Sequence, residues 1–362
     1  MQDHLIALPR GATVRLAQAP PVARPWLENT RRFIGVAGHV ALLLDLLVDR
    51  GIDPNHLLRG TRVFRETLHD GNRRISPLEL ARIFGNAARL SQHPDCSFVL
   101  GQRLWPGIFN HYSAALLHAP DLATALRLLA DHSDVYFPLL KPRLLFSAAQ
   151  CHVLFEDAFG VLGDAATRRF AVETWMSAVV SLADWLGGHK LSWQARLSHS
   201  EPAWLEQYEV ALGPNLSFGY PYCALSINQH STWLAWPRAS KTAFRMAASA
   251  CRVPGGRETD ESLLTRVREF MLADIQRTPS LPELAEAFGM SPATLKRQFG
   301  RHNTAYQKLA DGVRRQLASF LMQDLRLPAG AVADCLGYHD TSNFRRSLRR
   351  WACWPSAARH VR

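Results

Sequence analysis

One pattern of residues occurs twice between Leu281 and Trp351, and it constrains the fold more than any other feature of the chain. Ser280 followed three residues later by Glu283 is a capping box, an arrangement that begins a helix. Gly289 ends this helix, because glycine readily adopts the left-handed conformation that closes one. Gly337 stands at the equivalent place 48 positions later. The pattern therefore predicts two copies of one short helical unit.

Each copy continues with a second helix whose inner and outer faces differ. Ser291 before Pro292 is placed to cap this helix in the first copy, and Asp340 is placed to cap its counterpart. Apolar residues four positions apart face inward, and they are Leu295 and Phe299 in one helix and Phe344 and Leu348 in the other. The outward residues are Ala293, Lys296 and Arg297 in the first copy and Thr341, Ser342, Asn343, Arg345 and Arg346 in the second. Each copy is thus predicted to be a helix-turn-helix.

The segment between the copies predicts one long helix. Thr304 to Leu325 contains no proline and carries apolar residues at helical spacing. A helix of about 20 residues spans roughly 30 Å, close to one turn of DNA, so the two units fit successive major grooves. A solvated helix face is the ordinary explanation of a single basic helix. Two matched copies at a fixed spacing favour DNA binding.

The charge distribution points to the same part of the chain. Residues 262–362 hold 16 Lys and Arg against 8 Asp and Glu, a net +8 of the total +11, which leaves +3 for residues 1–261. A basic excess concentrated on one domain is the electrostatic footprint of phosphate contact, and it predicts salt-sensitive binding.

The same stretch resembles the DNA-binding domain of the AraC/XylS family of bacterial transcription regulators. The second copy carries most of the resemblance, through Ala333 to Tyr338, Ser342 to Trp351, Pro355 and Arg359. One departure lies at Cys353-Trp354-Pro355, where the family usually has a glycine before a Ser/Thr-Pro pair. The resemblance implies an all-α domain that reads operator DNA with both units.

The basic residues divide into two expected roles. Base-edge contacts are expected from the eight outward residues named above, with Arg297 and Arg346 foremost, since arginine bidentate to guanine is the commonest specific contact. Phosphate contacts, which position the protein without reading sequence, are expected from Arg301, Arg314, Arg349 and Arg350.

The rest of the chain predicts an α+β protein. We expect a flexible arm over 1–30 with a short strand near Thr13 to Leu16, a mixed α/β effector-binding and dimerisation domain over 31–252, a linker over 253–261 and the DNA-binding domain over 262–362. Within the second of these regions, Asp164 to Leu186 reads as a long helix and Phe98 to Leu104 as a short apolar turn. The sheet is expected to be small and antiparallel. The order of elements resembles the arabinose-binding-like N-terminal domain of one AraC subgroup.

No motif in the sequence indicates enzyme chemistry. There is no phosphate-binding glycine loop, no H-E-x-x-H zinc motif and no G-x-S-x-G nucleophile elbow. The six cysteines form no C-x-x-C pair, and the 15 histidines show no ligand spacing. We therefore expect no catalytic residues, no metal and no cofactor.

Two segments mix aromatic and polar residues as ligand pockets do. They are Phe109 to Tyr112 and Asp131 to Phe137, and ordinary domain edges have the same composition. The expected effector-lining residues are Phe109, His111, Tyr112 and Tyr136.

The sequence as a whole predicts a cytoplasmic, homodimeric transcription activator. Its expected partners are double-stranded DNA, RNA polymerase and a small-molecule effector, without a membrane, because the most apolar run, Ile34 to Val48, is too short to cross a bilayer. A ligand-independent dimeric regulator is one alternative. An enzyme domain fused to a DNA-binding domain is the other.

Overall fold

The computed structural model describes residues 4–7, 13–16, 26–91, 93–107, 109–251 and 261–351. The chain divides into two compact units, Pro25–Thr265 and Arg266–Arg362 together with Met1–Arg24. The predicted linker lies outside the described residues except for Glu261, and so does the departure at Cys353-Trp354-Pro355. The predicted domain boundaries therefore stay predictions.

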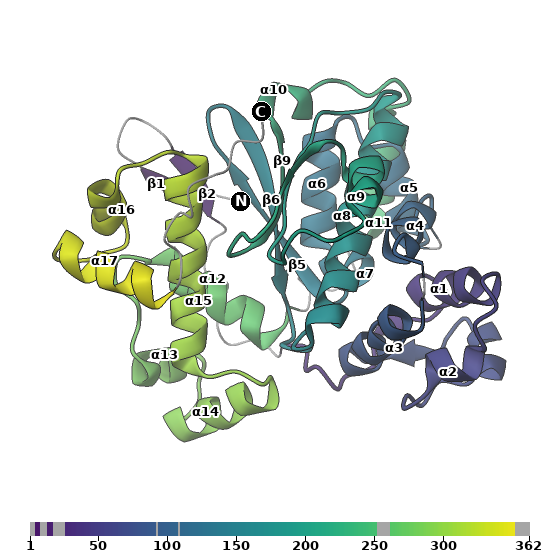
Figure 1. Cartoon of the computed structure of the whole chain (residues 1–362), viewed down its shortest axis with the longest axis horizontal. Coiled ribbons are helices and arrows are strands. Elements are labelled where there is room, and N and C mark those ends of the chain that lie inside the picture. Colours follow the sequence, from purple (N-terminus) through teal and green to yellow (C-terminus); the bar gives the residue numbers. More distant parts are fainter. Residues whose placement is uncertain are drawn as a thin grey trace. The chain divides into compact units, whose positions relative to one another are not determined.

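Helices form most of the N-terminal unit (Figure 1). A short antiparallel pair, β3 (Ile34–Gly35) and β4 (Arg74–Ile75), lies among its first helices. The helices of this unit are α1 (His39–Val48), α2 (Pro54–Leu58), the 3-10 helix η1 (Arg65–His69), α3 (Pro77–Leu90), α4 (Cys96–Arg103), α5 (His111–Leu117), α6 (Leu122–Asp131), α7 (Ser133–Tyr136), α8 (Ala165–Gly187), α9 (Leu205–Leu212), α10 (Gln229–Thr232) and α11 (Lys241–Cys251).

A five-stranded sheet runs beside these helices in the order β5-β6-β9-β7-β8. Its strands are β5 (Leu140–Phe146), β6 (Gln150–Asp157), β7 (Gln194–Arg196), β8 (Asn215–Ser217) and β9 (Cys223–Asn228). The expectation of a wholly antiparallel sheet is wrong at one edge, where β7 and β8 are parallel. A parallel pair needs a crossover, and α9 supplies it between the two strands.

The core of the N-terminal unit is built on α8. Trp175 is fully buried, and one face of the sheet, including Val153 and Leu225, belongs to the same apolar cluster. The apolar turn expected at Phe98 to Leu104 is in fact the helix α4, which packs on α8. Gly101 allows this approach, because a Cβ there would lie 2.1 Å from the Thr174 carbonyl oxygen.

The C-terminal unit is helical apart from one hairpin, in which β1 (His4–Ala7) pairs with β2 (Thr13–Leu16), the strand expected near Thr13. Its helices are α12 (Leu263–Ala273), whose first residues belong to the N-terminal unit, α13 (Leu281–Ala287), α14 (Pro292–Arg301), α15 (Tyr306–Ser319), the π-helical turn η2 (Phe320–Asp324), α16 (Ala329–Cys335) and α17 (Thr341–Arg350). In Figure 1, α15 runs between α13 and α14 at one end and α16 and α17 at the other. The long helix predicted over Thr304 to Leu325 is thus present, with its last turn wound as a π-helix.

Candidate nucleic-acid interface

The first helix-turn-helix is formed by α13 and α14. Ser280 and Glu283 make the predicted capping box, in which the Ser280 N–H donates to Glu283 Oε2 at 2.8 Å and Ser280 Oγ accepts from the Glu283 N–H. Gly289 follows with φ +61° and turns the chain into α14. Ser291 caps α14 by accepting the Thr294 N–H at 3.2 Å.

The outer face of α14 is the one that the residue pattern predicts. Leu295 and Phe299 are buried and fix the helix to its unit. The side chains of Ala293, Lys296 and Arg297 are exposed. These three positions are therefore accessible to a DNA groove.

The second helix-turn-helix repeats this arrangement with α16 and α17. Gly337 has φ +70°, and a Cβ there would lie 2.0 Å from the carbonyl oxygen of Gln276. Asp340 caps α17 by accepting the Asn343 N–H at 2.7 Å. The apolar positions Phe344 and Leu348 are buried.

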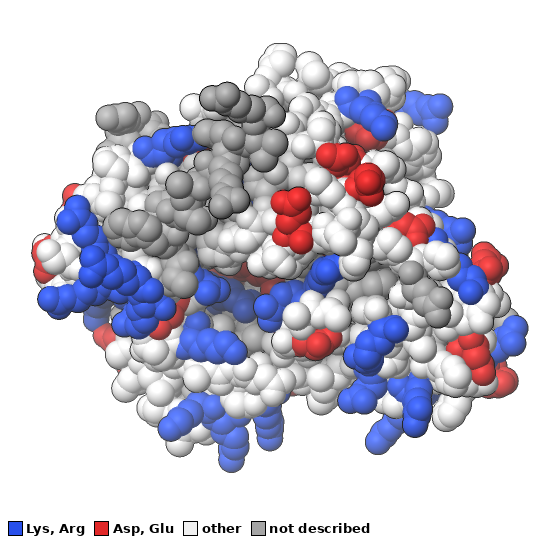
Figure 2. Space-filling view, viewed as in Figure 1, with Lys and Arg blue, Asp and Glu red and all other residues white. Residues whose placement is uncertain are grey.

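The outer face of α17 carries a longer polar row than that of α14. Thr341 is half-buried, and the exposed residues are Ser342, Asn343, Arg345, Arg346, Arg349 and Arg350. Asn343 Nδ2 donates to Asp340 Oδ2 at 2.6 Å, and Arg346 donates to Asn343 Oδ1 at 3.4 Å. Figure 2 shows basic side chains gathered over α17 and at α14. The electrostatics of both helices suit the polyanionic groove of DNA.

The four residues expected to contact phosphates lie in different surroundings. Arg349 is exposed, while Arg350 pairs with Asp311 of α15 at 2.9 Å. Arg301 donates to Gln298 of its own helix at 3.3 Å. Arg314 is half-buried with its guanidinium 5.5 Å from the centre of the Tyr338 ring. This contact packs α15 against the turn between α16 and α17, and it favours a packing role for Arg314 over a phosphate contact.

The residues expected to line an effector site lie mostly in a packed aromatic cluster. Tyr136 and Phe109 are 1% and 9% exposed, and their ring centres lie 5.7 Å apart. Tyr136 Oη donates to the Tyr112 carbonyl at 2.8 Å, whereas the His111 side chain is exposed. His39 packs against Phe109, and burial lowers the pKa of this histidine to about 4.

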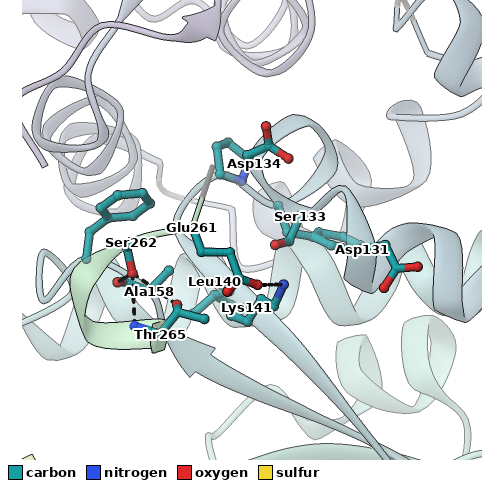
Figure 3. A pocket seen from close by; sticks show the side chains of 12 residues that line it. Asp131, Ser133, Asp134, Leu140, Lys141, Ala158, Glu261, Ser262 and Thr265 are labelled. Atoms are coloured by element: carbon teal, nitrogen blue, oxygen red, sulfur yellow. Dashed lines mark hydrogen bonds and ion pairs between the residues drawn. The ribbon is translucent and has the colours of Figure 1, made fainter. Parts of the chain in front are cut away.

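A separate pocket, open to solvent, is lined in part by Ser133 and Asp134 of α7 (Figure 3). The four residues just described are not part of its lining, but Asp131 to Phe137, the second mixed segment, contributes four residues to it. All of its lining lies in the N-terminal unit, and it comprises Asp131, Ser133, Asp134, Phe137, Pro138, Leu140, Lys141, Ala158, Phe159, Glu261, Ser262 and Thr265.

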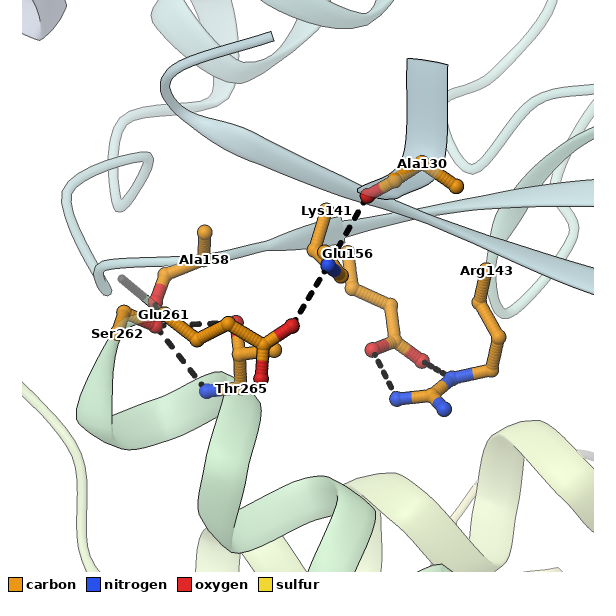
Figure 4. A network of polar contacts seen from close by, with 8 residues as sticks. All are labelled: Ala130, Lys141, Arg143, Glu156, Ala158, Glu261, Ser262 and Thr265. Atoms are coloured by element: carbon orange, nitrogen blue, oxygen red, sulfur yellow. Dashed lines mark hydrogen bonds and ion pairs between the residues drawn. The ribbon is translucent and has the colours of Figure 1, made fainter. Parts of the chain in front are cut away.

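Polar contacts at this pocket hold the start of α12 (Figure 4). Lys141 Nζ donates to the Ala130 carbonyl at 3.0 Å and to Glu261 Oε1 at 2.7 Å. Ser262 Oγ accepts the Thr265 N–H at 3.1 Å and so begins the helix. Sequence reasoning missed these residues, although Ser262 three positions before Thr265 is a readable capping signal.

The described residues contain neither a membrane-spanning helix nor a metal-binding cluster. No helix among them is both long and apolar enough to cross a membrane. Within the same residues, no three His, Cys, Asp or Glu side chains are placed to hold a metal ion.

Two helix-turn-helix units on one connecting helix define a DNA-binding protein of the double helix-turn-helix class. Comparison with known families agrees. Residues 51–237 match the arabinose-binding domain of AraC transcription regulators, and residues 284–359 match a helix-turn-helix domain. The chain belongs to the AraC family of transcription regulators.

Several characterised proteins are similar over most of the chain. The Ornithine utilization regulator of Pseudomonas aeruginosa is 28% identical over 333 residues, which cover 90% of this chain and 95% of the relative. The regulator VirS of Mycobacterium tuberculosis is 22% identical over 313 residues, 85% of this chain and 90% of the relative. The crystal structure of the transcriptional regulator CdpR from P. aeruginosa aligns with a TM-score of 0.45 and 20% identity, covering 87% of this chain and 95% of that one. The matched domains and relatives are transcription regulators, as the residue patterns predicted, and not enzymes.

Proposed function

We propose that this regulator reads its operator with the exposed rows of α14 and α17. The observation that carries the proposal is their matched geometry, since both helices follow a glycine of positive φ, begin at a side-chain cap and bury an apolar pair four residues apart. Base-edge contacts are assigned to Ala293, Lys296, Arg297, Thr341, Ser342, Asn343, Arg345 and Arg346, with Arg297 and Arg346 foremost. Phosphate contacts are assigned to Arg301 and Arg349.

The finer part of the proposal concerns control. A small effector binds at the open pocket at the start of α12. The pocket contains Glu261 and Ser262, directly before a helix that continues into the DNA-binding unit. A ligand that alters the Lys141–Glu261 contact would act on that helix. The regulator works as a cytoplasmic homodimer that activates transcription through contact with RNA polymerase, as the family resemblance implies.

The lining of the pocket narrows the effector class. Asp131, Asp134 and Glu261 bring carboxylates to it, and Lys141 brings an ammonium group. A molecule that carries both amino and carboxylate groups complements this set. The relative named Ornithine utilization regulator makes ornithine and other basic amino acids the first candidates.

Regulation by an effector is tested by measuring the thermal unfolding of the full chain in the presence of each member of a panel of basic amino acids. A true effector at 100 times its Kd stabilises the folded state by roughly 2.7 kcal/mol. Asp134→Asn is expected to reduce that shift, while Asp70→Asn, at an exposed site outside the pocket, keeps it. If no compound of a broad metabolite panel stabilises the chain, the ligand-independent dimeric regulator becomes the better description.

A further inference from the structure

A second basic surface lies in the N-terminal unit, away from both reading helices in the sequence. Seven arginines occur from Arg59 to Arg89 without a lysine, against three acids, Glu66, Asp70 and Glu79, which gives a net +4. Residues 1–261 together carry a net charge of only +3, so the net charge of this segment is larger than that of the whole region in which it lies. We name it the arginine patch, and its members are Arg59, Arg62, Arg65, Arg73, Arg74, Arg82 and Arg89.

Hydrogen bonds and close contacts join the segments that carry the arginine patch. Asn86 of α3 donates to the Arg59 carbonyl at 2.9 Å and accepts from Arg89 at 2.8 Å. Gly60, with φ +76°, lies against Arg82, since a Cβ there would be 3.1 Å from its Cδ. Arg73 donates to the Arg62 carbonyl at 2.7 Å. Figure 2 shows basic side chains gathered at α3, with acidic side chains beside them towards α2.

The charges of the arginine patch are not neutralised within the described part of the chain. No member forms an ion pair there, and six of the seven are exposed, with Arg73 half-buried. Of the three acids in the segment, Glu79 pairs with Arg32 at 2.6 Å, whereas Glu66 and Asp70 remain as negative charges beside the patch and reduce its net charge to +4. Seven like charges held together in this way repel one another, so a polyanion would bind with a gain in electrostatic free energy.

The composition of the arginine patch favours a phosphate backbone over a protein surface. Guanidinium groups match phosphate geometry in a bidentate fashion, and such contacts need no side-chain pocket. Protein interfaces instead centre on buried aromatic and aliphatic anchors. Between Arg59 and Arg89, the described residues expose two large apolar side chains, Phe64 and Leu78, and neither is a buried anchor.

We propose that the arginine patch binds phosphates of the same DNA duplex, outside the base pairs that α14 and α17 read. The N-terminal unit then adds affinity that is independent of sequence and sensitive to salt. This function rests on the DNA-binding activity of the family and is separate from the effector pocket.

The test uses the full chain with Arg59→Gln, Arg62→Gln and Arg65→Gln combined, since these guanidinium groups form no hydrogen bond or ion pair within the described residues. The matched control replaces three equally exposed cations of the same unit, as Arg238→Gln, Lys241→Gln and Arg245→Gln. Binding is measured against salt concentration on two duplexes, one trimmed to the operator footprint and one extended on both sides with unrelated sequence. Thermal unfolding verifies that each variant folds like the parent.

On the extended duplex, the patch variant is expected to lower the slope of log Kobs against log salt by about 2 to 3, because each lost phosphate contact contributes roughly 0.9. On the trimmed duplex, parent and variant bind alike, and the control variant matches the parent on both. Unchanged binding to the extended duplex overturns the proposal, as does an equal loss on both duplexes. Normal DNA binding with lost binding to RNA polymerase would overturn it too, by assigning the surface to an acidic protein partner.

Discussion

At the scale of single residues, the contacts of each arginine distinguish those that only face solvent from those that also hold the domain together. Arg314 and Arg350 belong to the same basic excess as Arg346 and Arg349, but one stacks on Tyr338 and the other pairs with Asp311. Net charge alone therefore overstates the number of groups available to DNA. The exposed row of α17 is the better guide.

Replacing Arg346 by alanine is expected to cost about 1–3 kcal/mol on the operator and to relax the preference at one base pair, because a base-edge contact is lost. Arg349→Ala, at an exposed position one turn further along α17, serves as the control. It should weaken specific and random DNA alike. Competition binding on single-base variants of the operator distinguishes the two, and an equal loss on operator and random DNA for Arg346→Ala would remove it from base readout.

At the scale of elements, the two helix-turn-helix units share a turn but differ in how tightly that turn is packed. Gly289 and Gly337 both have positive φ. Around Gly289 there is open space, whereas Gly337 lies against the backbone of Gln276, just beyond α12. The second unit is thus fixed to the body of its domain through a contact that only glycine permits.

This difference predicts unequal effects of the same substitution. Gly289→Ala should cost on the order of 1 kcal/mol, the ordinary penalty for a side chain in the left-handed region. Gly337→Ala should cost roughly 3 kcal/mol or more, since its Cβ would overlap the Gln276 carbonyl and the backbone must shift. Denaturant unfolding of the full-length variants measures both. Equal losses would show that the contact at Gln276 relaxes without cost.

At the scale of the whole molecule, the N-terminal unit depends on a neutral histidine in its core. His39 is 1% exposed, donates from Nε2 to the Tyr136 carbonyl at 2.9 Å, and lies 6.3 Å from the Trp175 ring centre. Burial lowers its pKa from 6.5 to about 4. A charged imidazole is therefore excluded from the folded core.

The pKa of His39 is lower in the folded state than in the unfolded chain, so protonation of His39 destabilises the folded state. The stability that neutral His39 contributes is therefore complete above pH 6.5 and is lost as the pH falls towards 4. The contribution is on the order of 3 kcal/mol. His39→Gln is expected to be less stable than the parent at pH 7.5 but to lose less stability between pH 7.5 and 5. Chemical unfolding followed by tryptophan fluorescence reports this, with His230→Gln at an exposed site as the control. An unchanged pH dependence in His39→Gln would assign the acid sensitivity to other groups.

Local interactions explain what the sequence determined by itself. Helix caps, closing glycines and apolar pairs four residues apart act within one or two turns, so Ser280, Ser291, Asp340, Leu295 and Phe344 were assigned correctly from the pattern alone. The long helix α8 followed from its apolar periodicity. The helix-turn-helix units and the family of the chain could be predicted for this reason.

Long-range packing decided the position of the pocket and the pairing of the strands. Tyr136 and Phe109 look like pocket residues in the sequence, yet tertiary contacts bury them in an aromatic cluster, and the pocket opens beside Lys141 and Glu261, 120 positions apart. The parallel pairing of β7 and β8 and the convergence of the arginine patch depend likewise on which distant segments meet. Spacing along the chain encodes the turns and faces of single helices, whereas pockets and shared surfaces arise from contacts that the chain makes only once it is folded.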